Sequence, residues 1–181
     1  MQVMKILAFA GSNSSESINH QLILFVGKQI NKAELEIIRL TEHNIPMYGI
    51  DIEKSVGIPK GVIDLCDNIQ TAQGIIISVA EHNGNVTAFF KNVIDWLSRY
   101  NRTFLEGKKI MLLSTSPGAK GGASALASTQ KMLSYFKGDL VTSYSLGNFY
   151  KIFKDEKIID GETEGKVKEL IKYFLSELSV N

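Results

Sequence analysis

The chain has 181 residues and a formal net charge of +1, with 44% hydrophobic and 22% charged residues. This composition indicates a folded globular protein with a sizeable core and excludes an intrinsically disordered chain. The balanced charge and the lack of a basic run give no reason to expect nucleic-acid binding, and no apolar run approaches the roughly 18 residues of a membrane span.

The cysteine content and the N-terminus bear on the compartment. The single cysteine, Cys66, excludes a disulfide bond within the chain and suits a reducing environment. The N-terminus leads straight into a strand-like run, with no signal peptide in front of it. We therefore expect a cytoplasmic protein, and a single domain over residues 1–181 because no repeat or second domain is visible.

The first elements are a strand, a polar loop and a helix. The apolar run 3–10 is too short for a typical helix and predicts a strand buried on both faces. The loop 11–19 holds four serines, two asparagines and no lysine or arginine. A helical pattern follows, with Leu22, Ile23, Val26 and Ile30 apolar. Free N–H groups at the start of this helix suit a phosphate. The alternative is an ordinary turn with Ser17 as the helix N-cap.

Apolar runs and helical patterns alternate along the rest of the chain. The expected strands are 35–40, 74–79, 109–114 and 140–146, the first and last of them at sheet edges. The expected helices are 60–72, 86–99, 123–136 and 161–178. Breaking residues predict an irregular segment at 41–59, and the pattern of 147–160 assigns no structure. This alternation predicts an α/β fold, in which helices cover both faces of a parallel sheet.

Three loops at the carboxyl ends of the expected strands, 11–19, 80–85 and 115–122, are rich in polar and small residues. Ligands of such sheets bind beyond this edge. The first loop suits a phosphate, and the glycines of the third loop would let the backbone approach a flat ligand. A mononucleotide with an aromatic ring has both features. The dinucleotide fingerprint and the Walker P-loop are both absent.

Motifs in these loops resemble those of the NADPH-dependent FMN reductase family, which includes azoreductases, chromate reductases and quinone reductases. The first family motif, G-S-x-R-x-x-S-x-N, is matched by Gly11, Ser12, Ser17 and Asn19, with Ser14 at the arginine position. The second motif, P-E-Y-N-G followed by L-K-N-x-x-D-W, is matched by Glu81, Asn83, Gly84, Lys91, Asn92, Asp95 and Trp96. Ala80 replaces its proline, and His82 replaces its tyrosine. The third motif, S-x-G-x-x-G-G, is matched by Ser116, Gly118, Gly121 and Gly122.

The resemblance implies a flavodoxin-like, doubly wound, five-stranded parallel sheet of strand order 2-1-3-4-5. It implies FMN as cofactor and NADPH or NADH as co-substrate. A hydride would pass through FMN to a small-molecule acceptor such as a flavin, a quinone, an azo compound or a metal oxyanion. It also implies a homodimer or homotetramer, with the K-N-x-x-D-W helix near the subunit contact. The alternatives are a flavodoxin-type electron carrier and a flavin-free binding module. Carriers of that type are strongly acidic, whereas this chain is near neutral.

The resemblance also assigns residues to the cofactor. The phosphate would be held by Ser12, Ser17 and Asn19, with Ser14 and Ile18 in the same loop. The isoalloxazine ring would be lined by Glu81, His82, Asn83 and Gly84. The third loop would approach the ring with Ser116, Gly118, Gly121 and Gly122. No metal-ligand spacing stands out, and no metal site is expected.

Several of these side chains have alternatives. His82 could donate a hydrogen bond or a proton near the flavin, or could be a solvent-facing loop histidine. Glu81 could face the flavin or cap the following helix. His20 and His43 are expected at the surface, and Cys66 in a buried apolar helix face. In the segment 41–58, Met47, Tyr48 and Ile50 could cover the ring or pack on a partner chain.

Overall fold

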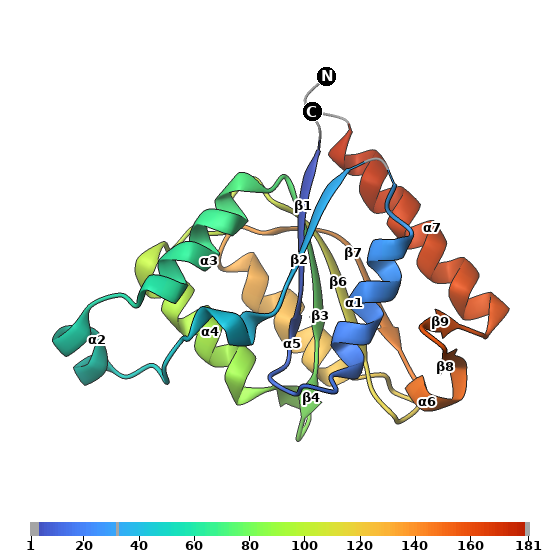
Figure 1. Cartoon of the computed structure of the whole chain (residues 1–181), viewed down its shortest axis with the longest axis horizontal. Coiled ribbons are helices and arrows are strands. Elements are labelled where there is room, and N and C mark those ends of the chain that lie inside the picture. Colours follow the sequence, from blue (N-terminus) through green and yellow to red (C-terminus); the bar gives the residue numbers. More distant parts are fainter. Residues whose placement is uncertain (1–3, 32, 180–181) are drawn as a thin grey trace.

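Five parallel strands form the central sheet in the order β2-β1-β3-β6-β7 (Figure 1). Their bounds are β1 Lys5–Gly11, β2 Glu34–Ile38, β3 Gly74–Val79, β6 Lys109–Thr115 and β7 Asp139–Leu146. This computed structural model describes residues 4–31 and 33–179. The expected order 2-1-3-4-5 is confirmed. The expected first strand, 3–10, starts at Lys5 in the described part of the chain, and residue 3 lies outside the described residues.

The burial of the strands follows their place in the sheet. Every residue of β3 is buried, and so are the six residues of β1 after Lys5, whereas β2 and β7 are partly exposed along their length. A central strand of a parallel sheet is covered on both faces and therefore carries a continuous apolar run. The two less regular runs, 35–40 and 140–146, are edge strands as expected.

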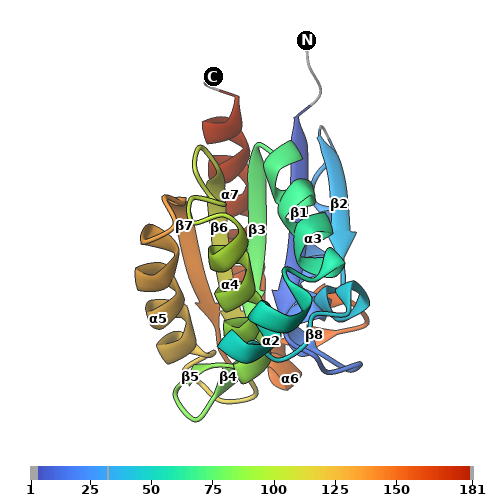
Figure 2. The ribbon, with the colours of Figure 1, turned by 90° about the vertical axis from the view of Figure 1, so that its left-hand side faces the viewer.

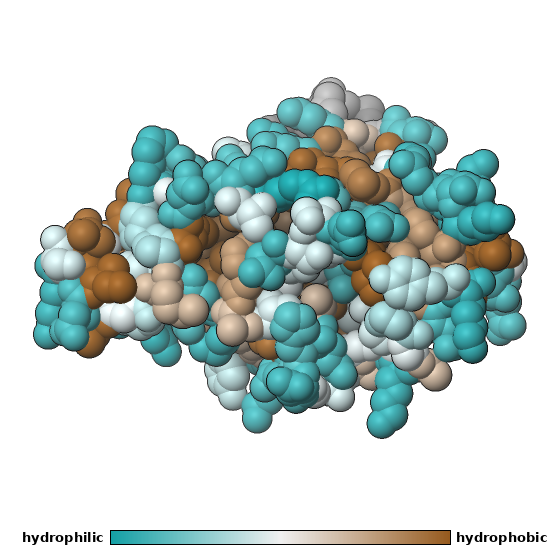
Figure 3. Space-filling model, turned by 60° about the horizontal axis from the view of Figure 1, so that its bottom comes forward, coloured by the Kyte–Doolittle hydropathy of each residue, from teal (hydrophilic) through white to brown (hydrophobic). Residues whose placement is uncertain are grey.

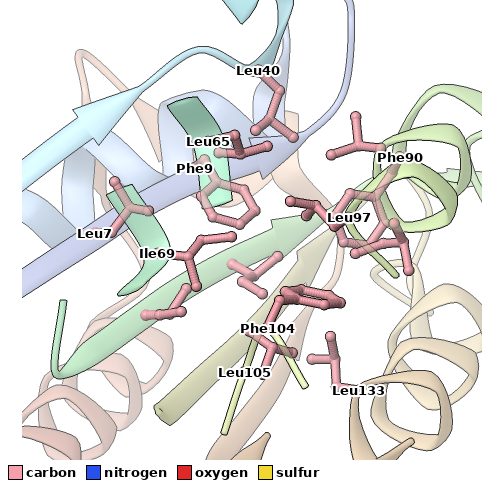
Figure 4. Close-up of a cluster of buried hydrophobic side chains, with 14 of the residues drawn as sticks. Leu7, Phe9, Leu40, Leu65, Ile69, Phe90, Leu97, Phe104, Leu105 and Leu133 are labelled. Atoms are coloured by element: carbon pink, nitrogen blue, oxygen red, sulfur yellow. The ribbon is translucent and has the colours of Figure 1, made fainter. Parts of the chain in front are cut away.

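Helices cover both faces of the sheet and enclose two cores. The helices α3 (Lys60–Thr71), α4 (Ala88–Tyr100) and α5 (Ala123–Ser134) pack on one face, and α1 (Ile18–Lys28) and α7 (Gly161–Leu178) on the other (Figure 2). Alternate residues of β1 enter opposite cores, with Leu7 and Phe9 in the first and Ile6 and Ala8 in the second. Figure 4 shows part of the first core. Cys66 lies there, buried as expected.

The segment 41–59 is only partly irregular, which corrects the expectation for it. It contains the end of a 3-10 helix, η1 (Leu40–His43), and the helix α2 (Ile50–Val56). The unassigned segment 147–160 forms α6 (Phe149–Ile152) and a small hairpin of β8 (Phe153–Lys154) and β9 (Lys157–Ile158). Elements this short contain too few residues to show a periodicity.

The loop 80–85 is a hairpin of β4 (Glu81–His82) and β5 (Asn85–Val86). Asn83 and Gly84 form its two-residue turn, with φ values of 53° and 75°. Positive φ at both central positions is the geometry that an Asn-Gly pair favours in a tight hairpin. The second family motif therefore includes a turn that presents His82 at the carboxyl edge of the sheet.

Residues 46–57, which we call the α2 arm, project from the body of the molecule (Figure 1). No residue of α2 is buried, and apolar side chains gather over this projecting end (Figure 3). The most exposed of them are Met47 at 65% and Val56 at 66%. The base of the arm is fixed to α4, because the carbonyl oxygen of Pro46 accepts hydrogen bonds from Asn92 Nδ2 (2.9 Å) and Trp96 Nε1 (2.8 Å).

Candidate functional site

A cleft of about 250 Å³ opens at the carboxyl edge of the sheet, between the loop after β1, the start of the β4–β5 hairpin and the loop after β6. Eight of the residues assigned to a cofactor line it: Ser12, Ser14, Ser17, Ile18, Asn19, Glu81, His82 and Ser116. They come from three segments that are far apart in the sequence. Parallel strands bring these segments together because all their carboxyl ends lie at one edge.

Five other assigned residues lie outside the lining of the cleft. Asn83 and Gly84 form the hairpin turn, and Gly118, Gly121 and Gly122 belong to the third loop. At Gly121, φ is +60°, and a Cβ atom would lie 2.6 Å from the carbonyl carbon of Leu146. The close packing of this loop against the end of β7 is thus a sufficient reason for glycine there. A contact of these five residues with a ligand stays a prediction.

The start of α1 presents unused hydrogen-bond donors to the cleft. Ser17 is the N-cap of α1, as the simpler interpretation predicts, and its Oγ accepts a hydrogen bond from His20 N–H at 3.2 Å. Within the described residues, the N–H groups of Ile18 and Asn19 donate to no protein acceptor. Ser14 Oγ accepts from Glu16 N–H (3.2 Å), which leaves its own hydroxyl proton free to donate. This donor set fits a phosphate group.

The side chain of Asn19 makes three hydrogen bonds within the protein. It is only 2% exposed, and its Oδ1 accepts hydrogen bonds from Ser78 Oγ (2.8 Å) and Thr115 N–H (3.0 Å). Its Nδ2 donates to the carbonyl oxygen of Thr115 at 3.2 Å. These bonds connect the first turn of α1 to the ends of β3 and β6. The backbone N–H of Asn19, which donates to no protein acceptor in the described residues, is free to contact a phosphate.

The carboxylate of Glu81 caps a helix, but not the one that directly follows it. Its Oε2 accepts hydrogen bonds from the N–H groups of Ser124 (2.9 Å) and Ala125 (3.0 Å), at the start of α5. The following helix, α4, has Thr87 as its N-cap. The alternative in which Glu81 caps the following helix is therefore wrong, because the hairpin turns the carboxylate toward α5. A carboxylate at a helix N-terminus is favoured by the helix dipole.

The β4–β5 hairpin has a second link to α5. Asn85 Oδ1 accepts a hydrogen bond from Ser128 Oγ at 3.2 Å, one turn of α5 beyond the contact of Glu81. His82 is exposed between these two anchors and lines the cleft. Its ring can therefore face either a bound ligand or solvent. The anchored hairpin holds the backbone of His82 at a defined place on the rim.

His20 is buried, which corrects the expectation of a surface histidine. It is 9% exposed and faces a second cavity of about 400 Å³, which we call the rear cavity, on the far side of the first loop. Burial, together with the nearby guanidinium of Arg39, lowers the pKa of His20, while Glu42 acts in the opposite direction. The imidazole is therefore neutral at pH 7. In the sequence, the apolar residues that follow His20 in α1 were only a weak signal that this histidine is buried.

The cleft also includes residues that were not assigned to the cofactor. These are Glu16, Ala80, Thr115, Pro117 and Tyr150. Tyr150 is 71% exposed and comes from α6, in the segment that the sequence pattern left unassigned. In the sequence, the available signal for Tyr150 was the aromatic pair Phe149-Tyr150 directly after the last strand. In the structure, Phe149 is buried and Tyr150 remains exposed at the rim of the cleft.

Met47, Tyr48 and Ile50 are not among the residues that line the cleft. Tyr48 packs edge-on against Trp96, with 5.1 Å between ring centroids, and its hydroxyl donates a hydrogen bond to Glu53 at 2.9 Å. Met47 and Ile50 are exposed on the α2 arm. In this chain, the arm therefore presents its apolar side chains to the exterior.

The described residues show neither a cluster of metal ligands nor a membrane-spanning helix. Across residues 4–31 and 33–179, no three His, Cys, Asp or Glu side chains gather where they could hold a metal ion. None of the described helices is both long and apolar enough to cross a membrane. The cleft is thus characterised by hydroxyl and N–H donors and by two carboxylates, those of Glu16 and Glu81.

Comparisons with known proteins agree with these motifs. Residues 4–150 match the family described as NADPH-dependent FMN reductase. A quinone reductase of Escherichia coli (strain K12) is 33% identical over 121 residues, which are 66% of this chain and 64% of that protein. A quinone reductase of Pseudomonas putida (strain KT2440) is 25% identical over 185 residues, 99% of this chain and 97% of that protein.

Solved structures show the same fold. The flavoenzyme NAD(P)H:(acceptor) oxidoreductase FerB from Paracoccus denitrificans has a TM-score of 0.79 at 24% identity, with 98% of both chains covered. An FMN-dependent NADH-azoreductase from Bacillus anthracis, solved in complex with FMN, has a TM-score of 0.61 at 15% identity and covers 93% of this chain and 98% of that chain. The chain spans less than two thirds of the length of the Escherichia coli relative.

Proposed function

Because the chain belongs to the NADPH-dependent FMN reductase family, we propose that it is an FMN-dependent NAD(P)H oxidoreductase. The observation that carries the proposal is the set of unused donors at the start of α1, at the carboxyl edge of a doubly wound sheet. A phosphate at this position would place the rest of a mononucleotide along the cleft, toward the hairpin and the third loop.

The residues of the cleft would divide the work of holding FMN. The hydroxyls of Ser12, Ser14 and Ser17 and the N–H groups of Ile18 and Asn19 would bind the phosphate. The ring would lie against the segment from Glu81 to Gly84 and against the third loop at Ser116, Gly118, Gly121 and Gly122. When bound, FMN supplies the capacity to accept a hydride and to pass it on.

Other side chains of the cleft would hold its loops in position rather than take part in the reaction. The amide of Asn19 holds the first and third loops at a fixed spacing, and the carboxylate of Glu81 fixes the hairpin on α5. His82 is the exposed side chain at the rim that can donate a hydrogen bond to a bound ring or substrate. The cleft thus contributes binding and orientation, with His82 as its candidate proton donor.

A quinone is the acceptor that we propose first. The relatives from Escherichia coli and Pseudomonas putida are both named quinone reductase, and the second aligns over nearly the whole chain. A flavin, an azo compound or a metal oxyanion remains a candidate acceptor, because an open cleft discriminates little between acceptors of different shape. The co-substrate is NADPH or NADH.

We also propose that the chain forms a homodimer, or a homotetramer built from it. Met47, Ile50 and Val56 are exposed together on the α2 arm, and no residue of α2 is buried. Exposed apolar side chains that gather on one projecting element are typical of an interface with another chain. Contact through the arm would remove this apolar surface from water.

Cys66 supports a cytoplasmic location. It is the single cysteine of the chain, and its thiol is free and buried in the first core. Burial raises the pKa of this thiol, so it stays protonated and unreactive at pH 7. A protein that folds around a free thiol suits a reducing compartment.

The visible spectrum of the purified protein tests the proposed function. We expect flavin absorption bands, from bound FMN or after FMN is added, and we expect NADPH or NADH to bleach them within seconds without oxygen. A protein that stays colourless and takes up no FMN would be a flavin-free binding module. A flavin that NAD(P)H bleaches only slowly would favour an electron carrier of the flavodoxin type.

A further inference from the structure

The cleft lacks a cation opposite the expected phosphate. Its lining contains no lysine or arginine, and it contains the carboxylates of Glu16 and Glu81. A phosphate monoester has a charge between −1.5 and −2 at pH 7. Neutral donors and the helix dipole at the start of α1 would meet its hydrogen-bonding needs and part of its charge, but the cleft offers no cationic side chain and includes Glu16.

Arg39 lies behind the same loop. It is the first residue after β2, whose last residue, Ile38, pairs with Phe9 two positions before the end of β1. Its side chain lines the rear cavity together with Ser15, Glu16 and Ser17. Glu16 and Ser17 line both cavities, which makes the first loop the wall between them. Arg39 is the one lysine or arginine that lines either cavity.

The guanidinium of Arg39 is available for a ligand. In residues 4–31 and 33–179, it makes no ion pair within 4.0 Å, and no side-chain hydrogen bond is formed by it. The acid on the opposite wall of the rear cavity, Glu156, is already paired with Lys28. The charge of Arg39 already acts on the first turn of α1, because it contributes to the lowered pKa of His20.

We propose that Arg39 supplies the positive charge for the phosphate of FMN, from behind the first loop. The proposal rests on the proposed function and adds the residue that compensates the phosphate charge. Arg39 is half-buried, so water screens its charge less than it screens that of an exposed cation. Its long side chain allows a direct contact past Ser15, or an attraction through the loop.

A comparison of two flavins tests this role without the use of activity. Flavin-free protein is titrated with FMN and with riboflavin, which has the same ring but no phosphate, and binding is followed by quenching of flavin fluorescence. We expect Arg39→Gln to weaken FMN binding about tenfold and to leave riboflavin binding unchanged. Arg39→Lys keeps the charge and should retain most of the FMN affinity. Arg102→Gln, an equal charge change at an exposed position far from the cleft, is the matched control.

The outcomes separate the two proposals. A selective loss of FMN affinity in Arg39→Gln that shrinks as salt is added supports the role of Arg39. Equal FMN affinity in Arg39→Gln and Arg102→Gln would overturn it. An equal loss for FMN and riboflavin would overturn it too, since Arg39 would then support only the shape of the site. If the unchanged protein binds neither flavin, the proposed function itself fails.

Discussion

At the scale of single residues, Asn19 controls the spacing of the cleft. Its amide forms three hydrogen bonds, to Ser78 and to both backbone groups of Thr115, and all of these partners are buried. A buried polar group that makes several hydrogen bonds favours one arrangement of its neighbours over others. The first and third loops are held together in this way, without a ligand.

Asn19→Ala should destabilise the protein by about 2–3 kcal/mol, because it leaves the hydroxyl of Ser78 and the backbone groups of Thr115 without partners in the core. Urea unfolding followed by circular dichroism measures the change. Asn13→Ala is the control, since Asn13 is exposed in the same loop. Equal stability of the two variants would contradict this role of Asn19.

At the scale of elements, the α2 arm is fixed by polar contacts and by the packing of Tyr48 on Trp96, while α2 itself has no buried residue. Glu53 on α2 forms an ion pair with Arg99 on α4 (3.0 Å) and accepts a hydrogen bond from the hydroxyl of Tyr48 (2.9 Å). The Arg99 and Tyr48 hydrogen bonds lower the pKa of Glu53. The stabilisation that Glu53 provides is therefore present above the ordinary pKa of a glutamate and is lost as the pH falls through the lowered value.

Trp96 can report on the arm, because it is the single tryptophan and its indole contacts both Pro46 and Tyr48. We expect Glu53→Gln to show at pH 7 a red-shifted Trp96 emission that the unchanged protein shows only in acid. Glu106→Gln is the matched control, since a lysine pair lowers the pKa of Glu106 too, but far from the arm. An identical emission spectrum for Glu53→Gln and the unchanged protein would show that other contacts hold the arm.

At the scale of the whole molecule, the two faces of the sheet are covered, and the arm is the part that remains open. Two apolar cores lie between the sheet and its helices, and both are closed by the chain itself. The exposed side chains of Met47, Ile50, Ile52 and Val56 lie outside these cores. Figure 3 shows hydrophobic side chains at the projecting end of the molecule, which is the arrangement expected for contact with a second copy.

The mass in solution tests this contact. We expect the unchanged protein to have about twice the mass of one 20.1 kDa chain in light scattering, or a multiple of that mass. A variant with Met47→Lys and Val56→Lys should shift to the monomer, because four such charges cannot be buried together in a dimer. Tyr135→Lys changes an equally exposed residue at the end of α5 and should keep the mass. A monomeric unchanged protein would exclude the proposed dimer.

Local patterns in the amino-acid sequence were sufficient to predict the strands of the sheet and the long helices that cover it. Continuous apolar runs such as 74–79 indicate central strands, and the spacing of Val62, Leu65, Cys66 and Ile69 indicates one face of a helix. The three motifs also placed eight residues that meet in the cleft. These features depend on neighbours within a few positions, so they are visible without the fold. The same patterns missed α2 and α6, whose turns are too few to be periodic.

Contacts between distant segments depended on the packing of the whole chain. Asn19 and Thr115 are 96 positions apart, and Glu81 and Ser124 are 43 apart, so no local pattern indicates that their polar groups are paired. The burial of His20 and the place of Arg39 behind the first loop depend on how α1 packs beside β2. Sequence motifs therefore identified eight of the residues that surround the cleft, whereas the tertiary structure decided which of their groups remain free to bind a ligand. Each hydrogen-bonding group is used by the partner that the fold brings within reach.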